Sequence, residues 1–320
     1  MQAIRVHSHG GPESLALDEV ATPEPGPGQV LIQVTAAGVN FVEIYQRKGV
    51  YAMSLPAILG GEGAGTVVAL GDGVTEVGVG DRVGSTEIRG SYAQYALADA
   101  RRVVPLPDSV SDEVGAAVLL QGMTAHYLLH DSYPVRAGDT VLVHAAAGGV
   151  GLLLTQMAHR LGARVIATTS TAEKAELARL AGADELLSYE DVPDKVRELT
   201  GGTGVAAVYD GVGTATFDAS LASLRLRGSM VLYGQSSGPV PPFDLQRLNS
   251  GGSLFVSRPT LAHFITTQEE LRRRAGDLFG WIGDGSLHVD ISHRYPLAEA
   301  ARAHEDLAAR RTTGKVLLIP

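Results

Sequence analysis

Cysteine is absent from the 320-residue sequence. Disulfide bonds, thiolate zinc sites and a cysteine nucleophile are therefore excluded. The ten histidines form no His-Glu-x-x-His pair and the serines no Gly-x-Ser-x-Gly elbow, so no metal site is readable and nucleophilic hydrolysis has no support. The Gly314–Lys315 pair lacks the leading glycine and the following Ser or Thr of a phosphate loop.

Long apolar runs are missing as well. No segment approaches the ~18 uninterrupted apolar residues of a membrane span, and the N-terminal MQAIRVHSHGG lacks the apolar stretch of a signal peptide. The net charge of −9 disfavours a general electrostatic grip on nucleic acid, although a local basic pocket for an anionic cofactor is compatible with it. We expect a cytoplasmic protein that binds neither membranes nor nucleic acid.

The length and composition predict two folded domains. With 45% hydrophobic and 19% charged residues, the chain can bury a sizeable core. Up to about Ala117, short strands broken by glycine and proline predict a β-rich, partly barrel-like domain. From about Leu119, apolar strands alternate with helical segments, which predicts a doubly wound parallel sheet covered by helices on both faces.

The segment after Thr260 is ambiguous by pattern. It predicts a helix around 268–280, a strand near 287–296, a helix over 297–309 and a terminal strand at 314–320. These elements could extend the parallel sheet or rejoin the first domain.

The stretch VLVHAAAGGVG, 141–151, indicates a nucleotide-binding turn. A buried-type strand precedes it, a helical pattern follows, and the three fingerprint positions are Ala146, Gly148 and Gly151. The first glycine is thus replaced, but the second lets the backbone approach a pyrophosphate and the third allows close helix packing. Free N–H groups at the helix start would bind the phosphates.

The end of the next strand favours NADPH over NADH. A carboxylate for the adenosine ribose is expected about 20 residues after the turn, but the sequence there reads Thr168, Thr169, Ser170. Lys174 follows, and Tyr189 ends the third strand. A 2′-phosphate would therefore meet hydroxyls and a cation.

Several separate motifs together resemble one family. They are GPGQVLIQVTAAGVNFVEIYQRKGVY, LPAILGGEGAGTVVALGDGVTEVGVGDRV, HAAAGGVG and VYDGVG, with further likeness in GQSSGPV, SLFVSRPTL and GKVLLIP. The chain is similar over nearly its whole length to the zinc-free quinone oxidoreductases, the ζ-crystallin-like branch of the medium-chain dehydrogenase/reductase family.

The resemblance implies a Rossmann domain over 120–261 and a GroES-like catalytic domain made of 1–119 and 262–320, so that the C-terminal segment returns to the first domain. The nicotinamide and its acceptor would lie between the domains. The resemblance also implies a homodimer formed through the edge strand in GSLFVSRP, which would pair its exposed backbone groups.

The chain departs from the zinc-bearing alcohol dehydrogenases at two positions. Gly61 stands where those enzymes carry the histidine of a Gly-His-Glu segment, and Asn40 where they carry a ligand cysteine. Without zinc there is no strong Lewis acid for simple alcohol oxidation. A quinone needs none, because it is already electron-poor, so we expect an NADPH-dependent quinone reductase. Reduction of activated double bonds in enals or enones, and non-catalytic NADPH binding, remain alternatives.

The resemblance and the turn together give the candidate site residues. The resemblance places Asn40, Tyr45 and Tyr51 beside the nicotinamide with Arg47 nearby, where they would position the acceptor. The expected cofactor contacts are Asn40, Tyr45, Thr124, Ala147, Gly148, Gly149, Val150, Gly151, Ser170, Lys174, Tyr189, Tyr233, Gln235, Ser236, Ser237, Phe255, Val256 and Arg310.

Overall fold

A computed structural model describes all of residues 1–320, which form two compact units. Unit 1 comprises Met1–Gln121 and Ile265–Pro320, and unit 2 comprises Gly122–Phe264. Unit 2 is one continuous segment, so it is inserted into the chain of unit 1. None of the helices is both long enough and apolar enough to span a membrane.

Unit 2 is built on a six-stranded parallel sheet with the strand order β11-β10-β9-β12-β13-β14. From β9 the chain adds β10 and then β11 on one side, and it then returns to add β12, β13 and β14 on the other side. The direction of winding therefore reverses between β9 and β12. This topology confirms the predicted doubly wound sheet. Its strands are β9 (Thr140–Val143), β10 (Arg164–Thr168), β11 (Glu185–Leu187), β12 (Val205–Asp210), β13 (Leu224–Leu232) and β14 (Phe255–Ser257).

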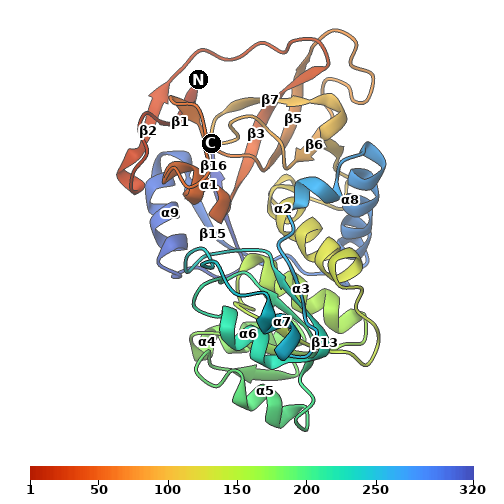
Figure 1. Cartoon of the computed structure of the whole chain (residues 1–320). Helices are drawn as coiled ribbons and strands as arrows, with labels where there is room; N and C mark the ends of the chain where they lie inside the picture. Colours follow the sequence, from red (N-terminus) through yellow and green to blue (C-terminus); the bar gives the residue numbers. More distant parts are fainter. The chain divides into compact units, whose positions relative to one another are not determined.

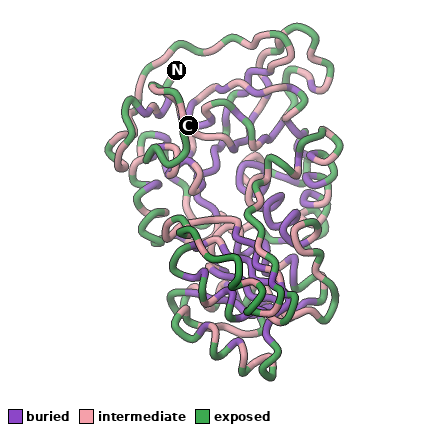
Figure 2. The backbone as a smooth tube through the Cα atoms, viewed as in Figure 1, coloured by how far each residue is buried: buried purple, intermediate pink, exposed green.

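The central strands are apolar throughout because both faces of the sheet are covered. Every residue of β12 is buried, and the core joins Leu142, Ile166 and Val208 to Phe217 of a covering helix. Figure 2 shows buried backbone concentrated in these strands. The helices of unit 2, labelled in Figure 1, are α3 (Gly149–Arg160), α4 (Ala172–Leu180), α5 (Asp194–Leu199), α6 (Phe217–Ser223) and α7 (Gln246–Ser250). The π-helical turn η3 (Leu128–Ser132) precedes them in the chain.

One helix is shorter than the sequence predicts. The pattern over 214–228 indicates a helix that reaches Gly228, but α6 ends at Ser223 and β13 begins at Leu224. The register of β13 against β12 then shifts, and Arg227 takes a left-handed conformation with φ of 58°. Pairing with a buried central strand therefore overrides the local helical preference of this segment.

Unit 1 contains a mostly antiparallel seven-stranded sheet and a separate three-stranded sheet of order β2-β1-β4. The larger sheet has the order β15-β16-β3-β5-β6-β8, and β7 also pairs with β3. The strands are β1 (Gln2–Val6), β2 (Leu15–Glu19), β3 (Gln29–Val39), β4 (Ala57–Ile58), β5 (Gly63–Leu70), β6 (Arg82–Ser85), β7 (Tyr95–Asp99), β8 (Val104–Pro105), β15 (Ile291–Pro296) and β16 (Lys315–Ile319). The β-rich first domain is thereby confirmed.

The C-terminal segment belongs to unit 1 because its last strand pairs with β3. The register sets Val316 opposite Val39 and Leu318 opposite Ala37. The helices of unit 1 are α1 (Phe41–Arg47), α8 (Gln268–Gly283) and α9 (Ala300–Ala308), and α2 (Asp112–Tyr127) begins in unit 1 and ends in unit 2. Short helical turns of unit 1 lie at η1 (Pro12–Ser14), η2 (Ala100–Arg102) and η5 (Leu297–Glu299), whereas η4 (Leu261–Phe264) ends unit 2.

Candidate functional site

The turn between β9 and α3 lies where the winding of the unit 2 sheet reverses. β9 ends at Val143, Ala145 has a left-handed φ of 52°, and Gly148 is the N-cap residue of α3. A Cβ on Gly151 would lie 2.3 Å from the carbonyl oxygen of Ala145 and 2.7 Å from Cα of Ala146. Position 151 therefore accepts only glycine while the turn keeps this shape.

Some backbone amides of this turn donate hydrogen bonds within the protein, and others are available to a ligand. Ala145 N donates to the Tyr189 hydroxyl at 3.1 Å, and Ala146 N donates to Thr168 O at 3.1 Å. The N–H groups of Gly149, Val150 and Gly151 lie in the first turn of α3, where the helix offers no carbonyl partner. These amides and the positive end of the helix dipole form a setting for a phosphate.

The end of β10 carries hydroxyl groups and no carboxylate. Thr168 and Thr169 are buried and Ser170 is exposed. The Thr171 side chain caps α4 by accepting a hydrogen bond from Lys174 N at 3.3 Å, which sets Lys174 in the first turn of that helix. The neighbouring exposed Glu173 is a carboxylate that the sequence analysis left out.

A buried polar network supports the turn from below. His144 directly follows β9, and its Nδ1 and Nε2 lie 2.9 Å from the Thr168 hydroxyl and 3.0 Å from the Ser220 hydroxyl. The Ser220 hydroxyl also donates to Asp210 Oδ2 at 2.8 Å, and Thr216 donates to the same oxygen at 2.7 Å. Burial lowers the pKa of His144 while Asp210 opposes that shift, so the imidazole is held neutral. The Tyr189 ring stacks on His144 with centroids 5.8 Å apart.

The segment after β13 is fastened to the segment after β12. The Ser237 hydroxyl donates to Val212 O at 2.7 Å and accepts from Ala215 N at 3.0 Å, while Ser236 N donates to Gly211 O at 3.2 Å. The Tyr233 ring lies against Gly211, where an added Cβ would be 2.8 Å from it, and Gln235 lies against Gly213. Burial and the nearby Asp210 raise the pKa of the Tyr233 hydroxyl, so it stays protonated. Because these loops follow neighbouring parallel strands, they share one edge of the sheet with the turn.

The structure does not bring every predicted cofactor residue to that edge. Phe255 and Val256 lie on the edge strand β14, where Phe255 is 61% exposed and pairs in register with Ser229, three residues before the end of β13. Thr124 is buried in α2. Arg310 belongs to unit 1, where it follows α9 with a left-handed φ of 59°.

In unit 1 the two predicted tyrosines lie together. The Tyr45 and Tyr51 rings meet edge to face with centroids 5.3 Å apart, and Phe41 lies 6.1 Å from Tyr45 on the same helix. Tyr51 N and Val50 N both donate to Tyr45 O, which folds the segment after α1 back onto the helix. Tyr51 is 38% exposed, so this aromatic pair is open to small molecules.

Arg47 is placed differently from these tyrosines. Its side chain is only 1% exposed, and its Nε and Nη1 atoms have no hydrogen-bond partner in the protein. Burial lowers the pKa of Arg47, and Glu13, Tyr92 and His304 are the titratable groups around it. Contact between Arg47 and an acceptor stays a prediction that this burial does not favour.

Asn40 belongs to a buried charged group, which we call the Lys315 cluster and define as Asn40, Glu43, Glu62 and Lys315. Lys315 Nζ donates to Glu62 Oε2 in a very short contact and to Asn40 Oδ1 at 2.8 Å. Asn40 Nδ2 donates to Glu62 Oε2 at 3.0 Å, and Leu120 N donates to Glu62 Oε1 at 2.7 Å. All four side chains are buried.

Glu43 completes the cluster from the first turn of α1. Its Oε2 accepts a hydrogen bond from Asn40 N at 2.9 Å. Burial raises the pKa of Glu43 from 4.5 to about 7, against the lowering effect of the Lys315 charge. Near neutral pH, Glu43 is thus divided between its protonated and ionised forms.

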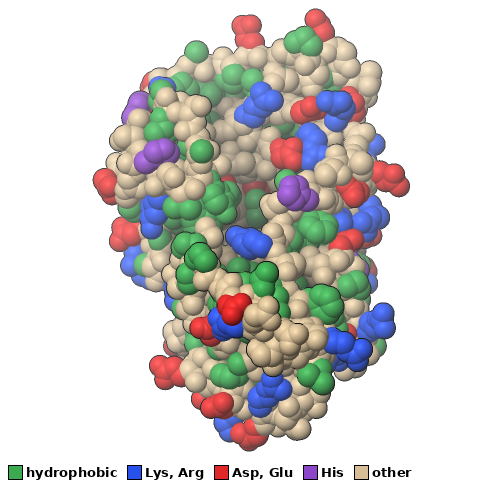
Figure 3. Space-filling view, in the orientation of Figure 1, with side chains coloured by type: hydrophobic (Ala, Val, Ile, Leu, Met, Phe, Trp, Pro, Cys, Tyr) green, Lys and Arg blue, Asp and Glu red, His purple; other side chains and the backbone are tan.

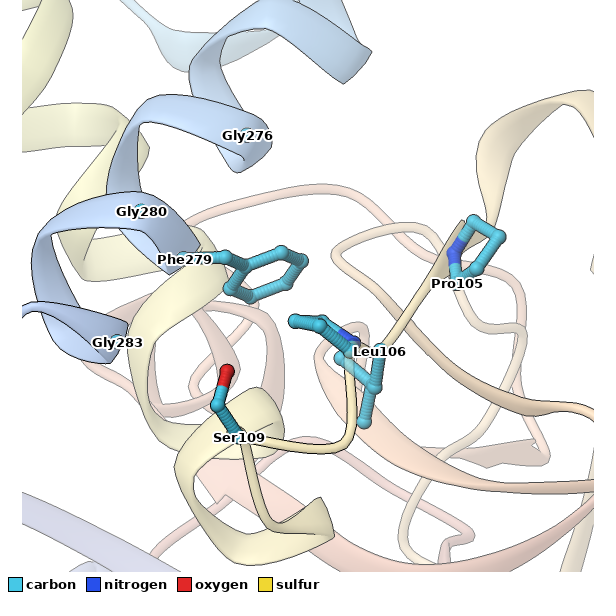
Figure 4. A pocket seen from close by; sticks show the side chains of 8 residues that line it. Pro105, Leu106, Ser109, Gly276, Phe279, Gly280 and Gly283 are labelled. Carbon is cyan, nitrogen blue, oxygen red and sulfur yellow. The ribbon is translucent and has the colours of Figure 1, made fainter.

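A hollow in unit 1 lies apart from all of these residues. It measures about 580 Å³ and lies between α8 and the segment that follows β8; its lining is Pro105, Leu106, Pro107, Ser109, Gly276, Phe279, Gly280 and Gly283. Figure 4 shows Phe279 and Leu106 facing each other across it. No predicted site residue lines it.

The structure shows no metal-binding group of side chains, and the face drawn in Figure 3 carries no single basic patch. No group of three or more His, Cys, Asp or Glu side chains is arranged to hold a metal ion. On the face drawn in Figure 3, Lys and Arg are interspersed with Asp and Glu and do not gather into one basic patch.

Sequence reasoning missed the residues that support the site. In the sequence, Lys315 belongs only to a Gly-Lys pair that does not fit a phosphate loop, and His144 and Asp210 lie within the motifs HAAAGGVG and VYDGVG. A signal was present, because each of these ionisable residues adjoins or ends an apolar strand, where burial requires a partner. The identity of each partner was not readable, because Glu62 is separated from Lys315 by 253 positions.

The chain matches two family models. Residues 26–108 match the model described as an alcohol dehydrogenase GroES-like domain, and residues 149–279 match the one described as a zinc-binding dehydrogenase. These matches agree with the β-rich unit 1 and the doubly wound unit 2.

Full-length relatives are similar to the whole chain. A quinone oxidoreductase of Pseudomonas aeruginosa is 46% identical over 99% of both chains, and a 2-haloacrylate reductase of a Burkholderia species is 41% identical over 100% of this chain and 99% of its own. Among solved structures, Escherichia coli quinone oxidoreductase complexed with NADPH is 42% identical over 100% of both chains, with a TM-score of 0.98.

Gly151→Ala should disrupt the turn, because the added methyl would lie 2.3 Å from Ala145 O. We expect a cost on the order of 1–3 kcal/mol, as for overpacking in a tight site, with weaker nucleotide binding. Thermal unfolding and NADPH titration measure both effects. Gly280→Ala is the control, since nothing lies within 4 Å of its added Cβ. Equal unfolding temperatures and NADPH affinities for the two variants would contradict the assigned close packing.

Glu43 should make stability depend on pH. The folded protein holds its proton up to a pKa of about 7, whereas the ordinary value is 4.5. Between these values the folded state binds more protons than the unfolded state, so the free energy of unfolding should fall as pH rises through this window. Glu43→Gln should remove that dependence. Denaturant unfolding at several pH values tests this, and the difference between the two proteins isolates Glu43 from groups such as His304 that both contain. If the free energy of unfolding depends on pH in the same way in the wild type and in Glu43→Gln, the prediction is wrong.

Proposed function

Because the chain belongs to the quinone oxidoreductase branch of the medium-chain dehydrogenase/reductase family, we propose that this oxidoreductase uses NADPH to reduce quinones by hydride transfer without zinc. Two solved relatives complexed with NADPH, the Escherichia coli enzyme and a mycobacterial protein that is 53% identical, support the choice of cofactor. The observation that carries the proposal is the nucleotide-type turn at the switch point of the unit 2 sheet, followed by a β10 end without a carboxylate.

The residues of unit 2 fit a dinucleotide phosphate. Gly149, Val150 and Gly151 would present their backbone N–H groups to the pyrophosphate at the start of α3. The N–H of Gly148 already donates to Ala145 O at 2.9 Å, so Gly148 would contribute by letting the backbone approach the pyrophosphate. Ser170, Lys174 and Tyr189 would hold the 2′-phosphate, with Tyr233 and the 235–237 segment along the nicotinamide half. The Tyr189 hydroxyl already accepts a hydrogen bond from Ala145 N, so it ties the 2′-phosphate region to the turn.

The residues of unit 1 fit an acceptor that needs no Lewis acid. When bound, NADPH supplies the hydride. Tyr45 and Tyr51 would orient the acceptor oxygen through their hydroxyls and exclude water with their rings. Asn40 lies one turn before Tyr45 on the chain and would add a polar group beside them. An electron-poor quinone would accept that hydride to give an aromatic hydroquinone anion, which a proton from solvent would convert to the hydroquinone.

Reduction of activated double bonds is the second candidate function. The 2-haloacrylate reductase is nearly as similar to this chain as the quinone oxidoreductases are. A conjugated carbonyl could use the same hydroxyl groups to stabilise its developing oxyanion. Steady-state NADPH oxidation with benzoquinone, naphthoquinone, enal and simple aldehyde acceptors distinguishes these functions, and activity with simple aldehydes alone would overturn both.

A homodimer through β14 accompanies the proposed function. β14 is the last strand of its sheet, so one side of it is unpaired, and Phe255 and Leu226 are both strongly exposed. Pairing of two such edges would cover this apolar surface and continue the sheet.

Lys174→Ala should weaken NADPH binding by at least about tenfold, because a charge-assisted contact to the 2′-phosphate contributes on the order of 1.5–3 kcal/mol. NADH binding should be nearly unchanged. Titration of both cofactors measures this. Thr169→Asp is the complementary variant, since a carboxylate near the ribose should shift preference toward NADH. Equal wild-type affinities for NADPH and NADH, or equal losses in Lys174→Ala, would exclude the 2′-phosphate assignment.

Tyr45→Phe should lower quinone turnover if the hydroxyl positions the acceptor, because one hydrogen bond contributes about 0.5–1.5 kcal/mol, a factor of roughly 2 to 10 in rate. Tyr45→Ala should lower it further, because the ring against Tyr51 is lost. The kcat and KM for benzoquinone measure both. If Tyr45→Phe keeps the wild-type kcat and KM while Tyr45→Ala loses most of its turnover, the role of Tyr45 is packing of its ring and not hydrogen bonding.

A further inference from the structure

The Lys315 cluster places one ammonium and two carboxyl groups in the interior of unit 1. The side chain of Lys315 is 1% exposed and that of Glu62 is 0% exposed. Burial of a charge is expensive, and it is tolerated only where geometry and hydrogen bonds compensate for the lost water. Here four parts of unit 1 meet to provide them, namely β16, the start of α1, the residue before β5 and α2.

The cluster fixes the side-chain amide of Asn40 at both ends. Its oxygen accepts from Lys315 Nζ at 2.8 Å and, more weakly, from Gln121 Nε2 at 3.4 Å. Its nitrogen donates to Glu62 Oε2 at 3.0 Å. Lys315 therefore determines which way the amide faces, because an ammonium only donates and must meet the oxygen.

We propose that Lys315 is a positioning residue for reduction of the acceptor: its ammonium orients Asn40 and neutralises the buried carboxylate of Glu62 at the acceptor end of unit 1. This inference rests on the proposed function. The zinc enzymes of the family carry a ligand cysteine at the position that the resemblance aligns with Asn40. The inference places a positive charge, that of Lys315, beside this position.

The charge balance of the cluster explains why a cation is needed there. With Lys315 and Glu62 both ionised, the cluster is neutral when Glu43 is protonated and carries a charge of −1 when Glu43 is ionised. A quinone that accepts a hydride develops negative charge on oxygen, and a net negative cluster would oppose it. Loss of the Glu43 proton should therefore slow the reaction. Loss of the ammonium changes the net charge by the same one unit and also removes the hydrogen bond that orients Asn40, so it should slow the reaction more.

The groups packed around Glu43 are few. Lys315 approaches from β16 and Glu62 from the segment before β5. The buried Tyr92 interacts electrostatically with both carboxyl groups and with Arg47, and it hydrogen-bonds His304 of α9 at 3.1 Å. Tyr92 has its pKa raised by burial, and burial lowers the pKa of His304 to about 3, so both stay neutral across the working range and Glu43 is the member that changes charge.

The test removes the ammonium of Lys315 without leaving the carboxylate of Glu62 buried and unpaired. Lys315→Met alone leaves a buried unpaired carboxylate and can fail to fold. The double variant Lys315→Met/Glu62→Gln removes both charges and keeps an oxygen for Leu120 N. The matched control, Lys195→Met/Glu198→Gln, removes an exposed lysine–glutamate pair on α5. Circular dichroism and thermal unfolding verify that each variant is folded.

The folded cluster variant has the same net charge as the wild type, so a change in its kcat reports the lost orientation of Asn40. With benzoquinone, kcat should fall on the order of tenfold, the effect of one charge-assisted contact. The Kd for NADPH should change less than kcat, because the proposed phosphate contacts belong to unit 2 and Asn40 is only one of the expected cofactor contacts. The control variant should match the wild type. A folded cluster variant with wild-type kcat would overturn the inference and leave quinone reduction intact. If the wild-type protein fails to oxidise NADPH with every acceptor in the panel, the proposed function is overturned, and this inference with it.

A pH profile supplies the readout that a purely structural role would not move. In the wild type, kcat should fall as pH rises through about 7, where Glu43 loses its proton. Glu43→Gln keeps an acceptor for Asn40 N and should abolish that fall. Identical pH profiles of kcat in the wild type and Glu43→Gln would show that the charge of the cluster does not affect the reaction. That result would overturn the electrostatic part of the inference.

Discussion

A buried ammonium constrains the elements around it more strictly than an apolar side chain of the same size. Lys315 needs acceptors at fixed directions, and it finds them on Glu62 and Asn40. Glu62 in turn binds the backbone of Leu120, and Asn40 binds Glu43 through its own backbone. The terminal strand β16, the N-terminus of α1 and the middle of α2 are thereby held in one geometry. An apolar core would tolerate small shifts of these elements, whereas a displaced carboxylate here loses its partner.

Unit 2 uses a different solution to a similar problem. The polar interior beneath its turn is organised around neutral groups and one carboxylate, with His144 linking Thr168 to Ser220 and Ser220 linking on to Asp210. Asp210 also accepts from the amides of Val212 and Gly213, so its charge is dispersed over several donors. The ends of β9, β10 and β12 are thus connected by side chains as well as by the sheet ladder. The turn between β9 and α3 gains a rigid base from this network.

The fold was predictable from the sequence because it depends on patterns that repeat along the chain. The alternation of apolar strands and helices from Leu119 onward gave the doubly wound sheet, and Gly148 and Gly151 located its turn. The pattern erred at 224–228, where two leucines and two arginines resemble a helix face and only pairing with β12 makes them a strand. Pattern alone also left the last 60 or so residues unplaced, because β16 pairs with β3 across most of the chain.

The candidate site was less predictable, for the same reason of sequence distance. Tyr45 and Tyr51 are six positions apart, and their contact follows from a helix and a short return. The orientation of Asn40 depends on Lys315, 275 positions away, and the burial of Arg47 depends on its packing within unit 1. Residue type and local motif identify which side chains are able to do chemistry. They do not say which of them are already engaged with one another.

The insertion of unit 2 within unit 1 sets an order of events during synthesis. Glu62 is made early, but its cation lies 253 positions later on the last strand, after all of unit 2. At ~5–20 residues per second, the carboxylate waits for Lys315 for on the order of tens of seconds. Throughout that interval Glu62 is better solvated outside the core than inside it, so this part of unit 1 should stay open. Unit 2, whose strands are contiguous in the chain, can meanwhile fold completely, and the arrival of a single lysine then closes the older part of the molecule around it.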